Sequence, residues 1–272
     1  MKTVTIINAE QDRFGQYVHK IWKHRSLIWA FAKRDVKIRY AQTRLGLFWV
    51  LLQPIPSVLI FSFLFGRLLN VDTGLLPYPV FALAGIAGWN YFTNLSDGVG
   101  NSLLESQNVL KKVAYPKLIM PLSKLLVSTL DFAVVFTLVL IALLVFGLVP
   151  SIKLLLLPAF ILVNIMAGFA IGIWMCALSY RYRDVRHFMP YFINFGIWLT
   201  PVFYPTTILP QNLSYFMYLN PMALVLEGYR SCLSGAALPS IGYLTSMIPL
   251  LLLLISGLWY FSRVEDEIVD YI

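Results

Sequence analysis

The chain has 272 residues, of which 59% are apolar and 12% are charged. A water-soluble domain is usually about half apolar and about a quarter charged, so these proportions exclude a single soluble domain of this size. The formal net charge of +8 comes from basic residues that cluster at the ends of apolar segments. This distribution is typical of membrane topology and argues against nucleic acid as a partner.

Six segments are long and apolar enough to cross a bilayer as helices, which takes about 20 residues. They cover residues 45–66, 78–99, 118–146, 154–179, 188–204 and 241–261. In this topology 18 of the 21 Lys and Arg residues lie on one side of the membrane, and only Arg67, Lys153 and Arg230 lie on the other. Basic residues stay on the cytoplasmic side during insertion, so both termini are expected in the cytoplasm. The sequence therefore predicts an all-α membrane protein with a six-span domain at 45–262 and a cytoplasmic tail at 263–272.

The N-terminal segment, residues 1–44, is expected in the cytoplasm and is too polar to act as a cleavable signal peptide. Residues 17–40 have the periodicity of a helix, with Trp22 and Trp29 on one stripe and basic residues over much of the remaining surface. Arg25 interrupts the apolar stripe. A basic amphipathic helix that carries Trp is typical of the headgroup layer, so an interface helix is predicted here.

A polar segment on the expected cytoplasmic side separates the second and third spans, and residues 102–113 within it are predicted to be helical. The segment ends at Pro116, because the residue before a proline avoids the helical region. Such a short helix is either a solvated connector or a surface that contacts a cytoplasmic partner. Composition does not decide between these two interpretations.

The segment between the fifth and sixth spans, on the expected outer side, is apolar and aromatic but is interrupted by prolines and glycines. Neither 210–220 nor 222–233 is long enough to cross a membrane. A pair of re-entrant helices at about 206–238 fits this pattern, because non-helical backbone at depth requires surrounding protein or a water-filled cavity. The alternative is a folded outer cap that does not enter the membrane.

The sequence carries no pattern of an enzyme or of a metal site. It contains no GxxxxGK[ST] phosphate loop, so the chain is not expected to hydrolyse ATP itself. Its three His residues are scattered and no HExxH motif occurs, so we assign no metal, no cofactor and no catalytic residue.

Acidic residues within the spans are few: Asp97 lies near one end of the second span and Asp131 in the middle of the third. A carboxylate in mid-membrane costs about 3 kcal/mol on insertion scales. Asp131 must therefore have a partner or be neutral, either as a structural hydrogen-bonding group or as a proton relay.

Aromatic residues recur in two of the spans, and in the fifth span their spacings of three, four and three place them on one face of a helix. They are Phe188, Tyr191, Phe195 and Trp198 in the fifth span and Trp89, Tyr91 and Phe92 in the second. Such side chains are either packing groups or the lining of a channel. Aromatic rings pack on the flat C–H faces of sugars without binding them tightly, and conduction requires many weak sites of this kind.

Several short runs, in order from about residue 30 to the C-terminus, resemble the type-2 ABC-transporter permeases that export bacterial cell-surface polysaccharides such as O-antigen, capsule and teichoic acid. The runs are RDVKIRY at 34–40, LG at 45–46, YPK at 115–117, RYRDV at 181–185, TPVFYP at 200–205, LNPM at 219–222 and EGYR at 227–230. Each run is weak alone, and their order and spacing across the spans carry the resemblance.

The resemblance implies a homodimer around a central channel, bound to two copies of a cytoplasmic ABC ATPase that holds ATP and Mg. It implies a lipid-linked polysaccharide as substrate, the bacterial cytoplasmic membrane as location, and contact with membrane lipid but not with nucleic acid. The helix at 102–113 becomes the coupling helix that docks into the ATPase, and the re-entrant pair becomes an outer gate. The resemblance assigns coupling to Glu105, Asn108, Lys111 and Lys112, the channel entrance to Arg39, Tyr40, Leu45 and Gly46, the channel lining to the aromatic residues above, and the outer gate to Tyr204, Asn220, Glu227 and Arg230.

Two other kinds of function stay open. The first is another kind of transporter: a small-molecule or lipid ABC exporter, or an ion-driven secondary transporter. Ion coupling usually requires more charged residues within the membrane than this chain has. A membrane-embedded glycosyl- or acyltransferase is the second, and it requires an acid, base or metal cluster that the sequence does not display.

Overall fold

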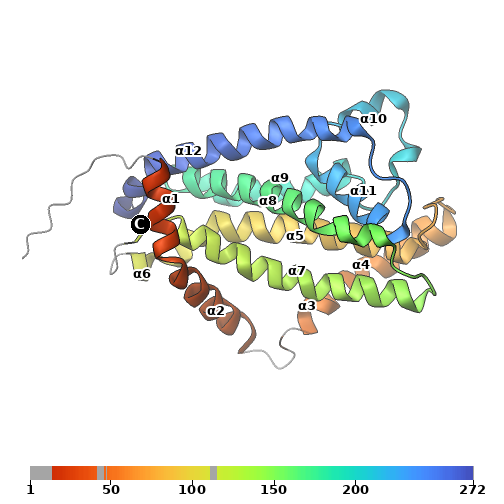
Figure 1. Ribbon diagram of the computed structural model, residues 1–272, viewed down its shortest axis with the longest axis horizontal. Coiled ribbons are helices and arrows are strands. Elements are labelled where there is room, and N and C mark those ends of the chain that lie inside the picture. Colours follow the sequence, from red (N-terminus) through yellow and green to blue (C-terminus); the bar gives the residue numbers. More distant parts are fainter. Residues whose placement is uncertain (1–13, 42–45, 47, 111–114, 272) are drawn as a thin grey trace, which may run out of the picture.

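The structure is a computed structural model that describes residues 14–41, 46, 48–110 and 115–271, and within these ranges it contains helices and no strand. The prediction of an all-α protein is therefore confirmed. The elements in chain order are α1 (Phe14–Lys23), α2 (Arg25–Ala41), α3 (Phe48–Leu52), α4 (Pro54–Phe61), the π-helical η1 (Ser62–Leu68), α5 (Tyr78–Glu105), α6 (Gln107–Leu110), α7 (Ile119–Val145), the 3-10 helix η2 (Ile152–Leu156), α8 (Leu157–Ser179), α9 (Arg183–Leu199), the 3-10 helix η3 (Thr206–Ile208), α10 (Gln211–Met217), α11 (Pro221–Ser234), the 3-10 helix η4 (Ile241–Ser246) and α12 (Met247–Tyr271). Figure 1 shows the long helices α5, α7, α8 and α12 running along the long axis of one bundle.

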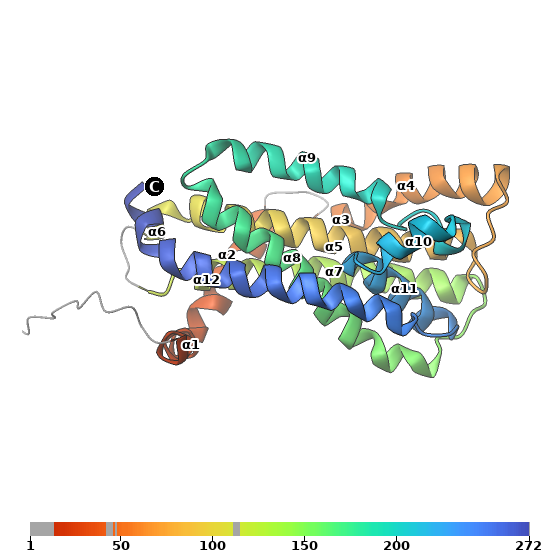
Figure 2. The ribbon, with the colours of Figure 1, turned by 90° about the horizontal axis from the view of Figure 1, so that it is seen from above.

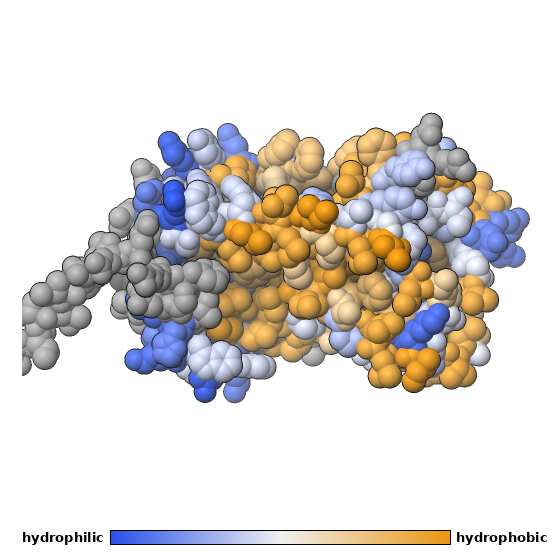
Figure 3. All heavy atoms as spheres, turned by 45° about the horizontal axis from the view of Figure 1, so that its top comes forward, coloured by the Kyte–Doolittle hydropathy of each residue, from blue (hydrophilic) through white to orange (hydrophobic). Residues whose placement is uncertain are grey.

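Four helical stretches among the described residues are long and apolar enough to cross a membrane. They are Phe48–Leu68, Ile119–Val145, Ile152–Ser179 and Ile241–Glu265. They correspond to the first, third, fourth and sixth predicted spans. Figure 3 shows an apolar zone around the middle of the bundle and hydrophilic residues mainly near its ends, as expected for helices surrounded by lipid.

The other two predicted spans are helical but do not meet the same criterion. Helix α5 has 28 residues, which corresponds to about 42 Å, and its length suffices, but amide and other polar side chains reduce its apolar character. Helix α9 has only 17 residues and contains Pro190. The count of six spans therefore stays a prediction.

The predicted interface helix at 17–40 is interrupted, because a turn at His24 separates α1 from α2. The His24 ring lies 2.8 Å from the Lys20 carbonyl oxygen, so this side chain bonds locally at the break. Helix α2 packs against α7 and buries Ala32 in the contact. Trp22 and Trp29 point outward and are about two-thirds exposed, which suits the headgroup layer that the sequence predicts for them.

Helix α5 forms the centre of the bundle, packed between α7 and α8 and touched by α4, α9 and α11. Small residues permit this close packing. A Cβ added at Gly172 of α8 would lie 2.6 Å from Val99 and 2.8 Å from the Ser96 carbonyl oxygen of α5. Membrane helices commonly associate through such small residues, because lipid provides no hydrophobic drive between them.

Two short helices, α10 and α11, occupy the predicted re-entrant segment. Helix α11 packs against α5 and α8 and has most of its side chains buried, so it is an integral part of the bundle. Its entry into a membrane stays a prediction. Figure 1 shows α1 and the end of α12 at the same end of the bundle, where the Tyr17 hydroxyl donates to Glu265 at 2.6 Å.

Candidate functional site

A cleft of about 560 Å³ opens where the end of α2 approaches α3, α4, α5 and α7. Arg39, Tyr40 and Gly46, three of the four residues predicted at the channel entrance, line this cleft. The fourth, Leu45, lies outside the described residues. Gly46 has a positive φ of 51°, a conformation that glycine adopts without strain, so it suits the turn between α2 and α3.

Asp131 of α7 closes the inner wall of the cleft, and both Arg39 and Tyr40 of α2 donate hydrogen bonds to its carboxylate. The expectation that this carboxylate needs a partner is therefore confirmed. The Asp131 side chain is 6% exposed, whereas the Arg39 side chain is 50% exposed. Burial and the neighbouring carboxylate raise the pKa of Tyr40, so its hydroxyl stays a donor.

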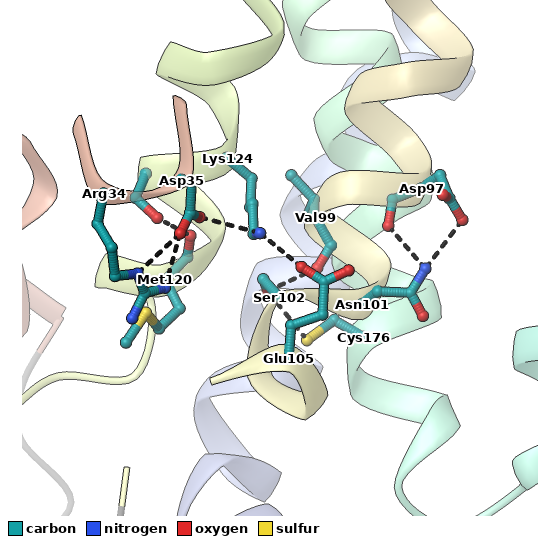
Figure 4. A network of polar contacts seen from close by, with 11 residues as sticks. Arg34, Asp35, Asp97, Val99, Asn101, Ser102, Glu105, Met120, Lys124 and Cys176 are labelled. Atoms are coloured by element: carbon teal, nitrogen blue, oxygen red, sulfur yellow. Dashed lines mark hydrogen bonds and ion pairs between the residues drawn. The ribbon is translucent and has the colours of Figure 1, made fainter. Parts of the chain in front are cut away.

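A second link between α2 and the bundle runs through Lys124 of α7 (Figure 4). Its ammonium group lies 2.9 Å from Asp35 of α2 and 2.5 Å from Glu105 at the end of α5. Arg34 pairs with the same Asp35 carboxylate at 2.7 Å. Lys124 thus joins three helices near the end of the bundle that holds α6. Sequence reasoning counted Lys124 only as a cytoplasmic basic residue, because no local pattern reports an ion pair between distant segments.

The predicted coupling helix at 102–113 has different bounds in the structure. Helix α5 continues through Glu105, the chain turns at Ser106, and only α6 (Gln107–Leu110) follows as a separate helix. Glu105 therefore belongs to α5 and is about half exposed beside Lys124. Asn108 lies in α6, whereas Lys111 and Lys112 lie outside the described residues.

The aromatic residues of α5 are packed inside the bundle of the single chain, and their role in lining a channel stays a prediction. Trp89, Tyr91 and Phe92 are at most 8% exposed. The Tyr91 ring stacks on Phe132 with centroids 4.6 Å apart, and its hydroxyl hydrogen-bonds to Thr129 at 2.7 Å. These contacts hold α5 against α7.

The aromatic residues of α9 form an exposed face. Phe188, Tyr191, Phe195 and Trp198 are between 57% and 77% exposed. Figure 2 shows α9 and α4 on the same side of the bundle, and Phe61 of α4 joins the two helices, with its ring centroid 6.1 Å from that of Trp198.

The predicted outer-gate residues gather around one turn, at residues 200–205. The Arg230 guanidinium is buried, donates to the Val202 carbonyl oxygen at 2.7 Å, and pairs with Glu227 at 3.4 Å. Asn220 caps α11 by accepting from Met222 N–H and donates to Thr200, and Tyr204 donates to the Trp198 carbonyl oxygen. These residues fasten α11 to the end of α9.

A helical bundle with four apolar spans defines an integral membrane protein, and its cleft lies beside the middle of the central helix α5. The chain matches the family model of the ABC-2 type transporter over residues 26–233 and belongs to this family. It is 25% identical over 250 residues to the O-antigen export system permease protein RfbA of Klebsiella pneumoniae, covering 90% of this chain and 94% of that protein. It is likewise 25% identical to the RfbA protein of Myxococcus xanthus (82% and 85% covered) and 21% identical to the polysialic acid transport protein KpsM of Escherichia coli (85% and 91% covered).

Proposed function

We propose that two copies of this chain form the channel of an ATP-driven exporter that moves a lipid-linked polysaccharide outward across the bacterial cytoplasmic membrane. Membership of the ABC-2 type transporter family supports this proposal, as do relatives named for O-antigen export and polysialic acid transport. ATP and Mg bind a separate ATPase, two copies of which dock at the end of the bundle that holds α6. Because the family model matches residues 26–233, the class of transport protein rests on the family, and the glycan substrate rests on the named relatives.

The exposed aromatic face of α9 is the observation that supports a paired channel most strongly. The four large rings lie on one helical stripe, and each is more than half exposed in the single chain. A second copy placed against this side would enclose the rings between the two protomers. Aromatic rings offer a sliding glycan many shallow contacts, which suits conduction of a polymer.

The ion pairs of Lys124 offer a mechanical path from the ATPase to the cleft. Movement of α6 acts on Glu105, from there on Lys124, and from Lys124 on Asp35 of α2. The last turn of α2 carries Arg39, which pairs with Asp131 at the wall of the cleft. Closure of the ATPase dimer around ATP is thereby converted into movement of the entrance, where the lipid-linked end of the glycan is admitted.

Affinity purification from native cells tests the transport class. The chain is solubilised in mild detergent, recovered with its partners, and assayed for ATP hydrolysis, while cells lacking the chain are assayed for surface polysaccharide. We expect a stoichiometric ATPase and a loss of surface polysaccharide in the deletion strain. A chain recovered alone, together with unchanged polysaccharide, would refute the proposal.

Cysteine cross-linking tests the pairing. The native Cys176 and Cys232 are both buried, so the background reaction is low. A Tyr191→Cys variant places a thiol on the exposed α9 face, and Leu155→Cys places one on η2, where the native side chain is 76% exposed. A bismaleimide is expected to give dimers with Tyr191→Cys and monomers with Leu155→Cys; the reverse pattern would place the dimer interface elsewhere.

A further inference from the structure

A row of polar side chains runs along one face of the central helix α5, within a bundle that is mostly apolar. Asn90, Asn94, Asp97 and Asn101 follow one another at spacings of four, three and four. At 3.6 residues per turn these positions fall within a sector of about 60° and extend over about 17 Å. None of the four is fully buried, in contrast to most of their neighbours in α5.

The amides nearest the middle of α5 make no hydrogen bond within the part of the chain that the structure describes. No described group donates to or accepts from the side chains of Asn90 and Asn94, and the same holds for Gln53, which faces them from the segment between α3 and α4. Asn90 and Asn94 are partly buried and Gln53 is exposed, so their amides are open to water or to a ligand. In a membrane-spanning bundle such groups are tolerated where they face water or a polar ligand.

The row leads directly out of the entrance cleft. Asn94 lines the 560 Å³ cleft together with Gln53 and Asp131. Asn90 lines the adjoining small pocket, one turn further into the bundle. Toward the other end, Asp97 is exposed and accepts a hydrogen bond from the Asn101 amide at 2.9 Å.

Helix α9, which carries the exposed rings, packs on the flank of α5 next to this row. Helix α9 packs on α5, where a Cβ added at Gly196 would lie 3.2 Å from the Trp89 ring. Trp89 directly precedes Asn90, the inner end of the polar row. Consecutive positions on a helix are about 100° apart, so the α9 contact and the polar row lie on neighbouring faces of the same segment of α5.

We propose that Gln53, Asn90 and Asn94, with Asp97 and Asn101 at the entrance end, form a hydrogen-bonding track for the hydroxyl groups of the transported glycan. This inference rests on the proposed function and adds the residues that contact the sugar. A glycan that leaves water loses the hydrogen bonds of its hydroxyls, and the side-chain amides replace them because an amide both donates and accepts. Each hydrogen bond contributes little net free energy, so the polymer makes many weak contacts and no single contact stops its movement.

Substitution of the track residues tests the proposal in cells whose own copy of the chain is deleted. The variants are Asn90→Leu, Asn94→Leu and the double variant, with Asn94→Gln as a conservative replacement that keeps the amide. Thr137→Val of α7 serves as the matched control, because Thr137 is exposed and its hydroxyl donates to the carbonyl of Ala133 in its own helix, at 2.8 Å. Surface polysaccharide is measured as extracted hexose per amount of chain in the membrane, and thermal stability is measured on the purified complex.

We expect each Leu variant to lower export about fivefold and the double variant about 25-fold, the effect of one and two lost hydrogen bonds of ordinary strength. Thr137→Val is expected to export normally, and Asn94→Gln, which keeps the amide, is expected to export more than Asn94→Leu. The Leu variants are expected to melt no earlier than the wild type, because Leu replaces an unpaired amide inside the bundle. Normal export by the double variant would overturn the proposed track. A loss of export would also count against it if the same variants melted at a lower temperature than the wild type. If the wild-type chain itself restores no polysaccharide to the deletion strain, the proposed function fails and the track fails with it.

Discussion

Replacing Arg39 is expected to damage the protein more than replacing Asp131, although the two residues form one ion pair. The reason is their unequal burial: the Asp131 side chain is 6% exposed and the Arg39 side chain is 50% exposed. An Arg39→Met variant leaves a buried carboxylate with Tyr40 as its remaining donor among the described residues. An Asp131→Leu variant leaves a guanidinium that already reaches water.

The structure sets the size of this asymmetry. A buried charge that loses its partner typically costs about 3–5 kcal/mol, which is the expected loss for Arg39→Met. For Asp131→Leu the expected loss is about 2 kcal/mol, because hydrogen bonds to a charged group are lost but no charge is left buried. The double variant is expected to be more stable than Arg39→Met alone, since removal of the carboxylate also removes the unpaired charge.

Thermal unfolding of the purified chain in mild detergent measures these differences. For a chain of this size 1 kcal/mol corresponds to roughly 2–4 °C in Tm, so the two single variants should be separated by several degrees. Lys37→Met, an exposed basic residue on the same helix, is the control and should melt like the wild type. Equal melting temperatures for Arg39→Met and Asp131→Leu would refute the reasoning from burial. A double variant that melts below Arg39→Met would refute it as well.

Two further predictions concern the ion pairs of Lys124 and the packing of Gly228. A Lys124→Met variant loses the ion pairs to Asp35 and Glu105. We expect the complex to continue to hydrolyse ATP while export falls about tenfold, which corresponds to about 1.4 kcal/mol. If the variant exports as much as the wild type at the same rate of ATP hydrolysis, these ion pairs have only a structural role. A Gly228→Ala variant places a Cβ 2.2 Å from the Phe160 ring and is expected to lower stability by about 1–3 kcal/mol through overpacking. A second change, Phe160→Leu, should restore part of the lost melting temperature, and an absence of any rescue would contradict the predicted clash.

The properties of single segments were predictable from the sequence, because they depend on local composition. Apolar stretches such as 118–146 and 154–179 are helices in the structure with nearly the predicted bounds. The break between α10 and α11 follows from Asn220 and Pro221, which cap and begin α11. The break at His24 was missed, because a single turn with helical neighbours on both sides leaves the hydrophobic periodicity almost unchanged.

The need for a partner at Asp131 was also predictable, because it follows from the solvation of a charge. The partners were not: Arg39 and Tyr40 precede Asp131 by 92 and 91 residues, and nothing local signals a contact over that separation. The same limit applies to Lys124 and to the aromatic residues. Helical spacing shows which side chains share a face, but only the packing of neighbouring helices decides whether that face is covered, as at Tyr91, or open, as at Tyr191.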